Sequence, residues 1–565
     1  MAANGNGYDV DVLIVGSGAA GLTAALTARS RGLDCLVIEK GSKIGGTSAI
    51  SGGAVWAPNN PIAKAAGVQD SRELALKYMD AAIGDAGPAS SNERRLAFID
   101  NVPQMVAFLR DLGFNWFFSK SGHPDYYPNL PGALSKGGRS LEPAIFSAMK
   151  LGGWWRYLLR PDRNILAIHN NQTPGLTRPM ASLRDFIEAI WVLTKVKIRT
   201  WFTRDPVSMG SSLISQLLWL NDNKKVDIWR EAELVQLIMG PDGSVVGAKV
   251  DKSGSPIEIR AKHGVLLCAG GFARNKEMRE EYGRAPSSTE WTMTQPYGDT
   301  GDAVRAGMEV GGATALIDDS WWIPVLKDPV DGQINFAVFE MSKPFAIVVD
   351  SSGSRFFAEA EPYADAGHSQ YKRHDIVPAI PAWLIVDTNH RRRYTLGTLP
   401  PRREPTEALA DGRVLKADSL EELAHKTGVD VAGLRKTIDH WNAMCKDGTD
   451  HDFGKGSDTY QRYLGDPNIK PNPNMGPIVR APFYATKVFP GDLGTKGGLL
   501  TDEHARVLGK DGIPIPGLYA AGNSSASVMG HKYCGAGATI GPAMTFAFIA
   551  ARHMGEQGAR HLNCG

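Results

Sequence analysis

Residues Val10–Val15 (VDVLIV) and the turn after them, Gly16-Ser17-Gly18-Ala19-Ala20-Gly21, decide the fold of this chain. The first stretch is short and rich in β-branched residues, which predicts a strand. Residues 22–32 (LTAALTARSRG) carry apolar side chains at helical spacing, and Cys35–Ile38 predicts a second strand that ends at Glu39. A strand, a glycine-rich turn, a helix and a strand in this order predict a βαβ unit that binds a dinucleotide.

The three glycines of the turn have separate physical roles. Gly16 permits the tight passage from strand to helix, Gly18 lets the backbone approach a pyrophosphate, and Gly21 lets the helix pack closely on the strand. The pyrophosphate would lie at a helix N-terminus, where free N–H groups and the helix dipole favour negative charge. Glu39 can accept hydrogen bonds from ribose hydroxyls and disfavours a 2′-phosphate, so the motif fits FAD or NAD and not NADP.

The nucleotide-binding domain is expected to come from both ends of the chain. Val265–Cys268 leads into Ala269-Gly270-Gly271, and Leu518–Ala520 leads into Ala521-Gly522-Asn523, so both stretches predict further parallel strands. We therefore assign this domain to residues 1–140, 206–323 and 495–565.

Residues 324–494 predict a second, inserted domain with a catalytic role. They combine short strands, Phe345–Val349 and Ala382–Val386, with a polar helical stretch around 419–446. The expected fold class is α/β, with a Rossmann-like nucleotide-binding domain and an inserted α+β domain.

Size and composition narrow the classes of function. A chain of 565 residues with 43% hydrophobic and 22% charged residues fits a soluble protein of two or more domains. Its formal net charge of +2 is too small to indicate nucleic acid as a partner. The five cysteines are scattered, without the spacing of a metal site or a disulfide framework, and the N-terminus lacks a signal-peptide pattern. These features predict a cytoplasmic protein without a metal.

Residues 141–205 break the pattern of the rest of the chain. They hold ten Lys/Arg against five Asp/Glu, mixed with bulky aromatic side chains in FSAMKLGGWWRYLLR and LRDFIEAIWVLTKVKIRTWF. This composition suits a segment that lies in a membrane interface, which would place the protein peripherally on the inner face of the cell membrane. The alternative is a hydrophobic hairpin packed on its own protein or on a dimer partner.

Three separated motifs resemble the succinate dehydrogenase/fumarate reductase flavoprotein superfamily. They are residues 39–53 (EKGSKIGGTSAISGG), residues 268–272 (CAGGF) and residues 519–523 (YAAGN). The resemblance implies FAD as the cofactor. Together with the first glycine-rich turn, it implies as FAD-binding residues Gly16, Gly18, Ala19, Ala20, Gly21, Glu39, Lys40, Gly46, Thr47, Ser48, Ser51, Gly52, Gly53, Ala269, Gly270, Gly522, Asn523, Gly537, Thr539 and Ile540.

Within that superfamily, three stretches resemble the 3-ketosteroid Δ1-dehydrogenase family. They are residues 528–544 (VMGHKYCGAGATIGPAM), 123–128 (HPDYYP) and 490–495 (PGDLGT). The family's catalytic groups are three tyrosines and a glycine amide, which the resemblance carries to Tyr126, Tyr363, Tyr533 and Gly537. Tyr127 remains open as the alternative to Tyr126.

These residue types suit the removal of hydrogens from C1 and C2 beside a 3-ketone. The ketone acidifies C2 only if the charge on its oxygen is stabilised, and the Tyr533 hydroxyl with the Gly537 N–H would supply two donors. Tyr363 would take the C2 proton as tyrosinate. A free tyrosine titrates near pKa ~10, so donors such as the Tyr126 hydroxyl would have to lower that value, and we expect an alkaline optimum.

Other functions on the same fold remain open at this point. A 3-ketosteroid 4-dehydrogenase or a fumarate/enoate-type reductase is the nearest alternative. Where a fumarate reductase has an arginine as proton donor, residues 354–363 offer the neutral Tyr363, which disfavours a charged substrate. A flavin-binding protein without turnover is a different class. No second nucleotide motif is evident, so we expect electrons to pass to a quinone or an artificial acceptor.

Overall fold

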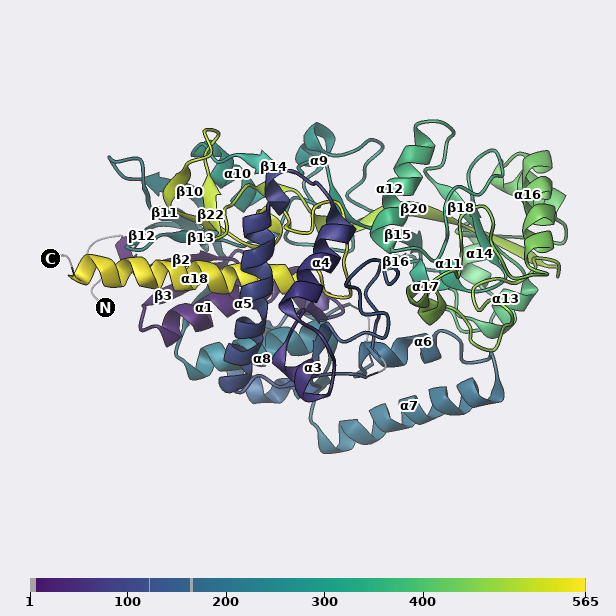
Figure 1. Ribbon diagram of the computed structural model, residues 1–565, viewed down its shortest axis with the longest axis horizontal. Coiled ribbons are helices and arrows are strands. Elements are labelled where there is room, and N and C mark those ends of the chain that lie inside the picture. The colour runs from purple at the N-terminus through teal and green to yellow at the C-terminus, as the bar shows by residue number, and fades with distance from the viewer. Residues whose placement is uncertain (1–6, 121, 163–165, 564–565) are drawn as a thin grey trace.

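The computed structural model describes residues 7–120, 122–162 and 166–563 of the chain. One mixed sheet built from both ends of the chain lies on the left of the molecule, and an antiparallel sheet from the middle of the chain lies on the right (Figure 1). Arg163, one of the ten basic residues of the 141–205 segment, and Cys564, one of the five cysteines, lie outside the described residues.

The left-hand sheet is the expected nucleotide-binding sheet. Five of its strands run parallel, and the sixth, β22, pairs antiparallel with β23 at the edge. The strand order is β22 (Arg506–Leu508), β23 (Pro514–Ala520), β13 (Val265–Leu267), β2 (Val12–Val15), β3 (Cys35–Glu39) and β9 (Asp227–Arg230). The three strands that precede glycine-rich turns therefore lie side by side, although about 500 residues separate the first from the last.

The prediction of one strand over Val10–Val15 is wrong in detail. The chain forms β1 (Gly7–Val10), which pairs with β12, and then β2, which belongs to the parallel sheet. Asp11 lies at the break, where its carboxylate accepts a hydrogen bond of 2.9 Å from the Asp34 N–H. An aspartate that bonds to a neighbouring turn in this way interrupts the strand and directs its two halves into different sheets.

The two faces of the parallel sheet are covered by different layers. On one face packs the sheet β1–β12–β11–β10, formed by β12 (Ser255–Ala261), β11 (Val245–Lys252) and β10 (Ala232–Met239). Leu13 and Val15 of β2 are buried against this layer, whereas Val12 and Ile14 belong to the core shared with the helices. This alternation is the period of two that a strand buried on both faces requires. The helices of the other face include α1 (Ala19–Ser30), α5 (Asn92–Asp111), α8 (Met209–Asn223) and α18 (Ile540–Asn563).

The right-hand sheet belongs to the inserted part of the chain. Its strands are β16 (Ile334–Phe336), β15 (Ser320–Lys327), β20 (Phe483–Thr495), β18 (Ala382–Val386) and β17 (Ala346–Val349), with β19 (Val414–Ala417) also paired to β20. The long strand β20 leads out of this sheet toward residues that contact the nucleotide domain. Helices of this part include α11 (Val338–Ser342), α12 (Tyr363–His374), α13 (Thr388–Arg393), α15 (Leu420–Thr427), α16 (Val431–Met444) and α17 (Thr459–Leu464).

The described residues of the aromatic and basic segment (residues 141–205) lie at the periphery of the molecule. The segment contains the 3-10 helix η2 (Ala148–Tyr157), α6 (Thr173–Leu176) and the 20-residue helix α7 (Leu183–Phe202). Helix α7 runs along the lower edge of the molecule (Figure 1). Within the described ranges, none of the helices has both the length and the apolar character needed to cross a membrane.

Candidate active site

The glycine-rich turn after β2 leaves no room for side chains at two of its three glycines. Gly16 has φ +110, and a Cβ there would lie 2.5 Å from the Cys268 carbonyl oxygen. A Cβ on Gly21 would lie 1.9 Å from the Gly16 carbonyl oxygen. Gly18 differs, because its φ of −69 is ordinary and a Cβ would meet only the Ser48 Oγ at 3.5 Å and the Gly45 oxygen at 3.9 Å. The space beside Gly18 at the start of α1 suits the approach of a diphosphate.

The acid at the end of β3 faces this turn. Glu39 accepts hydrogen bonds from the Ser17 hydroxyl at 2.6 Å and from the Gly41 N–H at 2.8 Å. The two oxygens of a carboxylate offer about four acceptor sites, so ribose hydroxyls can be accepted as well. Ser48, from the second part of the motif, reaches the same turn and accepts from the Ala19 N–H at 3.3 Å.

The loop of residues 40–53 is tied to the segment around residue 300. Lys40 donates to the Thr300 hydroxyl and pairs with Asp302 at 2.6 Å, while the Thr47 hydroxyl donates to Asp299 at 2.6 Å. Burial raises the pKa of Asp299 to about 6, although Thr47 and the Gly271 N–H oppose the shift. Lys40 therefore acts in this structure as an anchor of the loop.

The three flavin motifs converge on one place. A Cβ on Gly522 would contact Ala20 of the first motif and Ala543 of α18. The Ser524 hydroxyl donates to the Gly270 carbonyl at 2.8 Å, and the Trp321 indole N–H donates to the Asn523 side chain at 3.0 Å. In the first of these motifs, the Ser51 hydroxyl donates to the Ser48 carbonyl and accepts from the Gly53 N–H, which orders the turn through Gly52 and Gly53. Conformationally free glycines beside a helix N-terminus form a cradle that fits FAD.

A cluster of tyrosines, of which Tyr126 and Tyr533 are buried and Tyr363 is half-buried, lies where the two parts of the molecule meet. The Tyr126 hydroxyl donates to the Tyr363 hydroxyl at 3.3 Å. The ring centroids of Tyr363 and Tyr533 are 4.8 Å apart, and those of Tyr126 and Tyr533 are 5.4 Å apart and stacked. Tyr460 of α17 packs on Tyr126 at 4.4 Å, and Trp321 of β15 meets Tyr533 edge-on at 5.4 Å. Segments separated by about 400 residues thus supply one aromatic cluster.

Each member of the cluster is held by its own local structure. The Tyr126 N–H donates to the Cys534 carbonyl at 3.1 Å, which links the loop of the first tyrosine to that of the third. The neighbouring carboxylate of Asp125 accepts from Arg139 at 2.7 Å and from the Trp56 indole at 3.1 Å, and all three side chains are buried. Tyr363 is the first residue of α12.

Tyr533 and Gly537 are brought together by the glycine-rich turn between them. The Thr539 hydroxyl lies 3.3 Å from the Tyr533 hydroxyl. Burial raises the pKa of Tyr533, while hydrogen bonds from Thr539 and the Gly537 backbone amide lower it. Gly537 has φ +92, and a Cβ there would lie 2.4 Å from the backbone of Ala54. Only glycine places this amide beside the phenol.

The three tyrosine hydroxyls have raised pKa values because they are buried. Desolvation raises the pKa of Tyr126 and raises that of Tyr363 well above its usual value. We expected neighbouring donors to lower the pKa of Tyr363, and the structure shows the opposite direction. Loss of water around the phenolate is the largest cause of this shift, and none of the neighbouring phenols offsets it.

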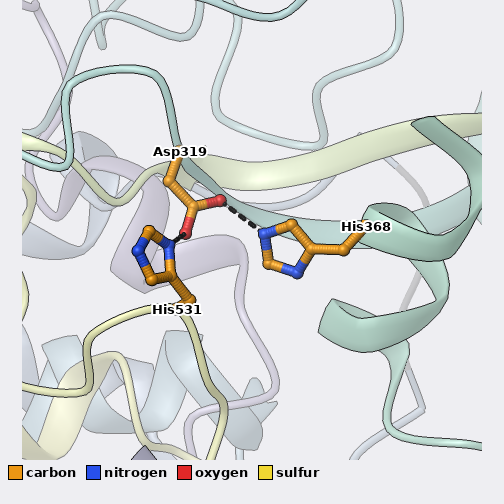
Figure 2. Close-up of side chains that lie close together, drawn as sticks. All are labelled: Asp319, His368 and His531. Carbon is orange, nitrogen blue, oxygen red and sulfur yellow. Dashed lines mark hydrogen bonds and ion pairs between the residues drawn. The ribbon is translucent and has the colours of Figure 1, made fainter. Parts of the chain in front are cut away.

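Next to Tyr533, an aspartate joins two histidines and a lysine. Asp319 accepts from His368 at 2.9 Å and from His531 at 2.8 Å (Figure 2). Its carboxylate is buried, and Lys496 lies 3.7 Å away. Burial would raise the pKa of Asp319, but Lys496 and the two histidines hold it well below its usual range. This cluster ties the loop before Tyr533 to β15 and α12.

Comparisons with known proteins agree with this geometry. The family model "FAD binding domain" matches residues 11–540. The 3-oxosteroid 1-dehydrogenase of Mycolicibacterium smegmatis is 42% identical, covering 96% of this chain and 97% of that protein. A 4-oxocyclohex-2-ene-1-carboxylate 5-dehydrogenase of Sinomonas cyclohexanicum is 34% identical, covering 98% and 95%.

Among solved structures, the 3-ketosteroid Δ1-dehydrogenase of Sterolibacterium denitrificans in complex with 1,4-androstadiene-3,17-dione matches with a TM-score of 0.91. It is 38% identical and covers 97% of this chain and 100% of that one. The chain belongs to the 3-ketosteroid Δ1-dehydrogenase family. Family membership confirms the α/β fold class with its FAD-binding domain, and the cofactor is FAD.

The structure separates the two candidate tyrosines of this family motif. Tyr126 lies in the cluster with Tyr363 and Tyr533, whereas the Tyr127 ring lies under the ammonium of Lys532 at 5.3 Å. The catalytic roles of Tyr126, Tyr363, Tyr533 and Gly537 remain predictions, but the fold brings all four to one place.

Sequence reasoning missed several residues of this site. Tyr460 and Trp321 contact Tyr126 and Tyr533 directly, whereas Asp319, which also bonds His368, holds His531 two residues before Tyr533. None of them lies in a motif, so only the fold reveals them. Lys496, by contrast, follows the 490–495 stretch and lies over the Trp321 ring at 4.7 Å.

The arginine of the 354–363 stretch is not available to a substrate. Arg355 is buried and pairs with Glu359 at 2.8 Å and with Asp450 at 2.9 Å. Its charge is therefore neutralised within the inserted domain. This agrees with the expectation that the site does not hold a dicarboxylate.

A substitution at Gly18 tests the cofactor cradle separately from the fold. Gly18→Ala should fold normally, because its Cβ has room, but it should weaken FAD binding by about ten-fold or more, since the methyl group occupies the approach of the diphosphate. The measurement is titration of the apoprotein with FAD, alongside thermal unfolding without FAD. Gly21→Ala is the matched control, which should fail to fold because of its 1.9 Å clash. Gly18→Ala with unchanged FAD affinity would contradict this assignment.

Proposed function

We propose that this protein is an FAD-dependent 3-oxosteroid 1-dehydrogenase that introduces a C1–C2 double bond beside a 3-ketone. The observation that carries the proposal is the convergence of the Tyr533 hydroxyl and the Gly537 amide beside the Tyr126–Tyr363 pair. This arrangement offers two hydrogen-bond donors for one oxygen and one proton acceptor for a neighbouring carbon. The similarity to Δ1-dehydrogenases over nearly the whole chain supports it.

The oxygen of the 3-ketone is bound by the Tyr533 hydroxyl and the Gly537 N–H. As the C2 proton leaves, negative charge develops on that oxygen, and the two fixed donors stabilise it. Burial strengthens this effect, because the surrounding aromatic side chains exclude the water that would screen it. The two donors thus suit the binding of a neutral ketone.

Tyr363 takes the proton from C2, and Tyr126 donates a hydrogen bond to the oxygen that takes it. Bound FAD supplies the acceptor for the hydride that leaves C1. Because the Tyr126 ring packs against both Tyr460 and Tyr533, its hydroxyl is held in place. The pair therefore needs little reorganisation at the moment of transfer.

The test is anaerobic reduction of the flavin by a steroid. With androst-4-ene-3,17-dione, we expect the yellow flavin band to bleach and the product to carry a new C1–C2 double bond, identified by NMR. Tyr363→Phe should slow bleaching by about 10²–10⁴-fold, the usual contribution of a general base, without loss of bound FAD. Tyr484→Phe, a tyrosine of the inserted domain outside the cluster, is the control and should bleach normally.

The same experiment separates the alternatives. Bleaching by 5α-androstane-3,17-dione with a product double bond at C4–C5 would identify a 4-dehydrogenase. Reduction of fumarate would identify a reductase. No bleaching by any steroid, with flavin that dithionite still reduces, would overturn the proposal.

A second candidate substrate is a smaller cyclic ketone carboxylate. It is favoured by the similarity to the Sinomonas dehydrogenase of 4-oxocyclohex-2-ene-1-carboxylate. The ketone chemistry is the same, but a carboxylate needs a free cation near the site, and Arg355 and Lys496 are both engaged by buried acids. Bleaching by 4-oxocyclohexanecarboxylate and not by steroids would favour this candidate.

The rate should increase with pH on the alkaline side of neutral. The base acts in its deprotonated form, and burial raises the pKa of Tyr363, so the active fraction is small at neutral pH and increases about ten-fold per pH unit below that pKa. Tyr126→Phe removes the donor that stabilises the anion, so the increase should move to higher pH, whereas Tyr127→Phe should leave it unmoved. The measurement is the pH dependence of kcat/KM from pH 6 to 10. A flat profile, or equal shifts in both variants, would contradict tyrosinate catalysis by this pair.

We also propose that the protein resides in the cytoplasm, contacts the membrane peripherally and passes its electrons to a quinone. The four described cysteines are free, and three are buried, which suits a reducing compartment. Both quinones and steroids dissolve in lipid. A contact between the enzyme and a bilayer would therefore shorten the path of both molecules.

Helix α7 is the element that would make this contact, because its apolar face points away from the protein. Asp185, Ala189 and Val192 are its buried residues, and their spacing places them on one side of the helix. The large apolar residues are exposed and share the opposite side: Leu183, Phe186, Ile187, Ile190, Trp191, Ile198, Trp201 and Phe202. Trp201 and Phe202 are 74% and 84% exposed. An apolar stripe on the outer side of a helix, with lysines beside it, suits a lipid interface.

Two charges on this outer face should abolish membrane binding. Ile187→Glu with Trp191→Glu should reduce binding to vesicles of phosphatidylcholine and phosphatidylglycerol (3:1) by ten-fold or more, since burying a carboxylate in the interface is unfavourable. Ile376→Glu, at an equally exposed isoleucine of the inserted domain, is the control and should bind normally. Co-sedimentation measures both variants. Unchanged vesicle binding with a halved molar mass in solution would show that α7 contacts a second copy instead.

A further inference from the structure

A basic cavity lies on the inserted domain, away from the residues proposed to act on the steroid. It has a volume of about 630 Å³ and is lined by α13, by residues 402–404, by the start of β20 and by Met180 and Ala181. Six arginines line it, and the single carboxylate of its lining is that of Glu404. The arginines are Arg391, Arg392, Arg393, Arg402, Arg403 and Arg480.

Only part of this positive charge is used by the protein itself. Arg391 is buried and donates to the carbonyl oxygens of Tyr394 and Pro400, and Arg393 donates to that of Asn389. The remaining four arginines are exposed, and none forms an ion pair with a carboxylate of the described part of the chain. Glu404 carries only one negative charge, and its carboxylate also pairs with Lys416 at 2.7 Å.

The backbone that carries these arginines is fixed. Arg402 has φ +62, a conformation that non-glycine residues rarely adopt, and its N–H donates to the Arg391 carbonyl at 2.8 Å. The Arg480 N–H donates to the Asp387 carboxylate, which also accepts from the N–H groups of Asn389 and His390. Three separate segments are therefore held around one cavity with their cations gathered. A strained residue at such a place is typical of a binding site.

Gathered guanidinium groups repel one another unless an anion lies between them. At physiological ionic strength the screening length is about 8 Å, so neighbouring cations in one cavity remain coupled. The planar guanidinium fork matches the oxygens of phosphate with two parallel hydrogen bonds. We propose that this cavity, centred on Arg392, Arg402, Arg403 and Arg480, binds the phosphate groups of an anionic ligand.

The position of the cavity suggests where the phosphate comes from. Met180 and Ala181 lie two or three residues before Leu183, the first residue of α7. A phospholipid headgroup at the surface on which α7 rests would reach the cavity, and a soluble phosphate ester would reach it from solution. The lipid source rests on the proposed membrane contact of α7, whereas phosphate binding itself does not.

The test uses the FAD-loaded full chain with two probes, pyrophosphate in calorimetric titration and vesicles with or without phosphatidylglycerol. The variant Arg402→Asn with Arg403→Gln removes two charges, and asparagine tolerates the positive φ of position 402. The control Arg110→Gln with Arg435→Gln removes two exposed arginine charges elsewhere. We expect the cavity variant to lose at least ten-fold in affinity for one or both probes and the control to lose less than two-fold.

The two probes distinguish a lipid headgroup from a soluble phosphate ester. The proposal is wrong only if neither probe detects binding at the cavity. Loss of vesicle binding alone identifies the headgroup, and loss of pyrophosphate binding alone identifies a soluble ester. If the cavity variant matches the control with both probes, or if the wild-type protein binds neither, the proposal is overturned. Ile187→Glu/Trp191→Glu should keep pyrophosphate binding, and steroid bleaching should be unchanged in the cavity variant, so failure here is distinct from failure of the proposed function.

Discussion

Three phenol groups buried in mutual contact are the constraint on which the rest of this structure depends. Removing Tyr126, Tyr363 and Tyr533 from water raises the pKa of each. Burial makes an anion in this pocket unfavourable. In the proposed reaction, the same loss of water would make a tyrosinate that does form a strong base, and would make fixed donors effective at the ketone oxygen.

Holding three distant tyrosines together requires rigid connections, and the structure supplies them as buried ion pairs. Asp125 with Arg139 fixes the first tyrosine, and Asp319 with Lys496 fixes the loop of the third. Buried pairs contribute little net stability, but the loss of one partner leaves an uncompensated charge. Their value here is in fixing the geometry, because each partner has only one favourable position.

The sequence was sufficient to predict the elements that have a strict local requirement. The glycines at 16 and 21 are required by contacts of a Cβ with backbone, and β18 spans the predicted Ala382–Val386. The strand break at Asp11 and the contacts of Tyr460 and Asp319 could not be predicted, because they depend on partners far along the chain. The pKa of Tyr363 is also shifted in the direction opposite to the predicted one. A hydrogen bond can be inferred from a motif, but the extent of burial depends on the whole fold.

The same limit applies to α7, where the helical stripe was visible in the sequence but its direction was not. An amphipathic pattern predicts which residues share a face and not whether that face meets the core or the surroundings. Here the fold turns the small residues Ala189 and Val192 inward and Trp201 outward.

Apolar contact with a bilayer is not directional and would set only the depth of the helix. The cavity arginines, which lie on α13 and on residues 402–403 and 480 near the start of α7, would add a second, directional contact, because guanidinium groups bind phosphate in a defined geometry. In the proposed membrane contact, depth from α7 and orientation from the cavity beside its first turn would together fix how the enzyme faces the bilayer.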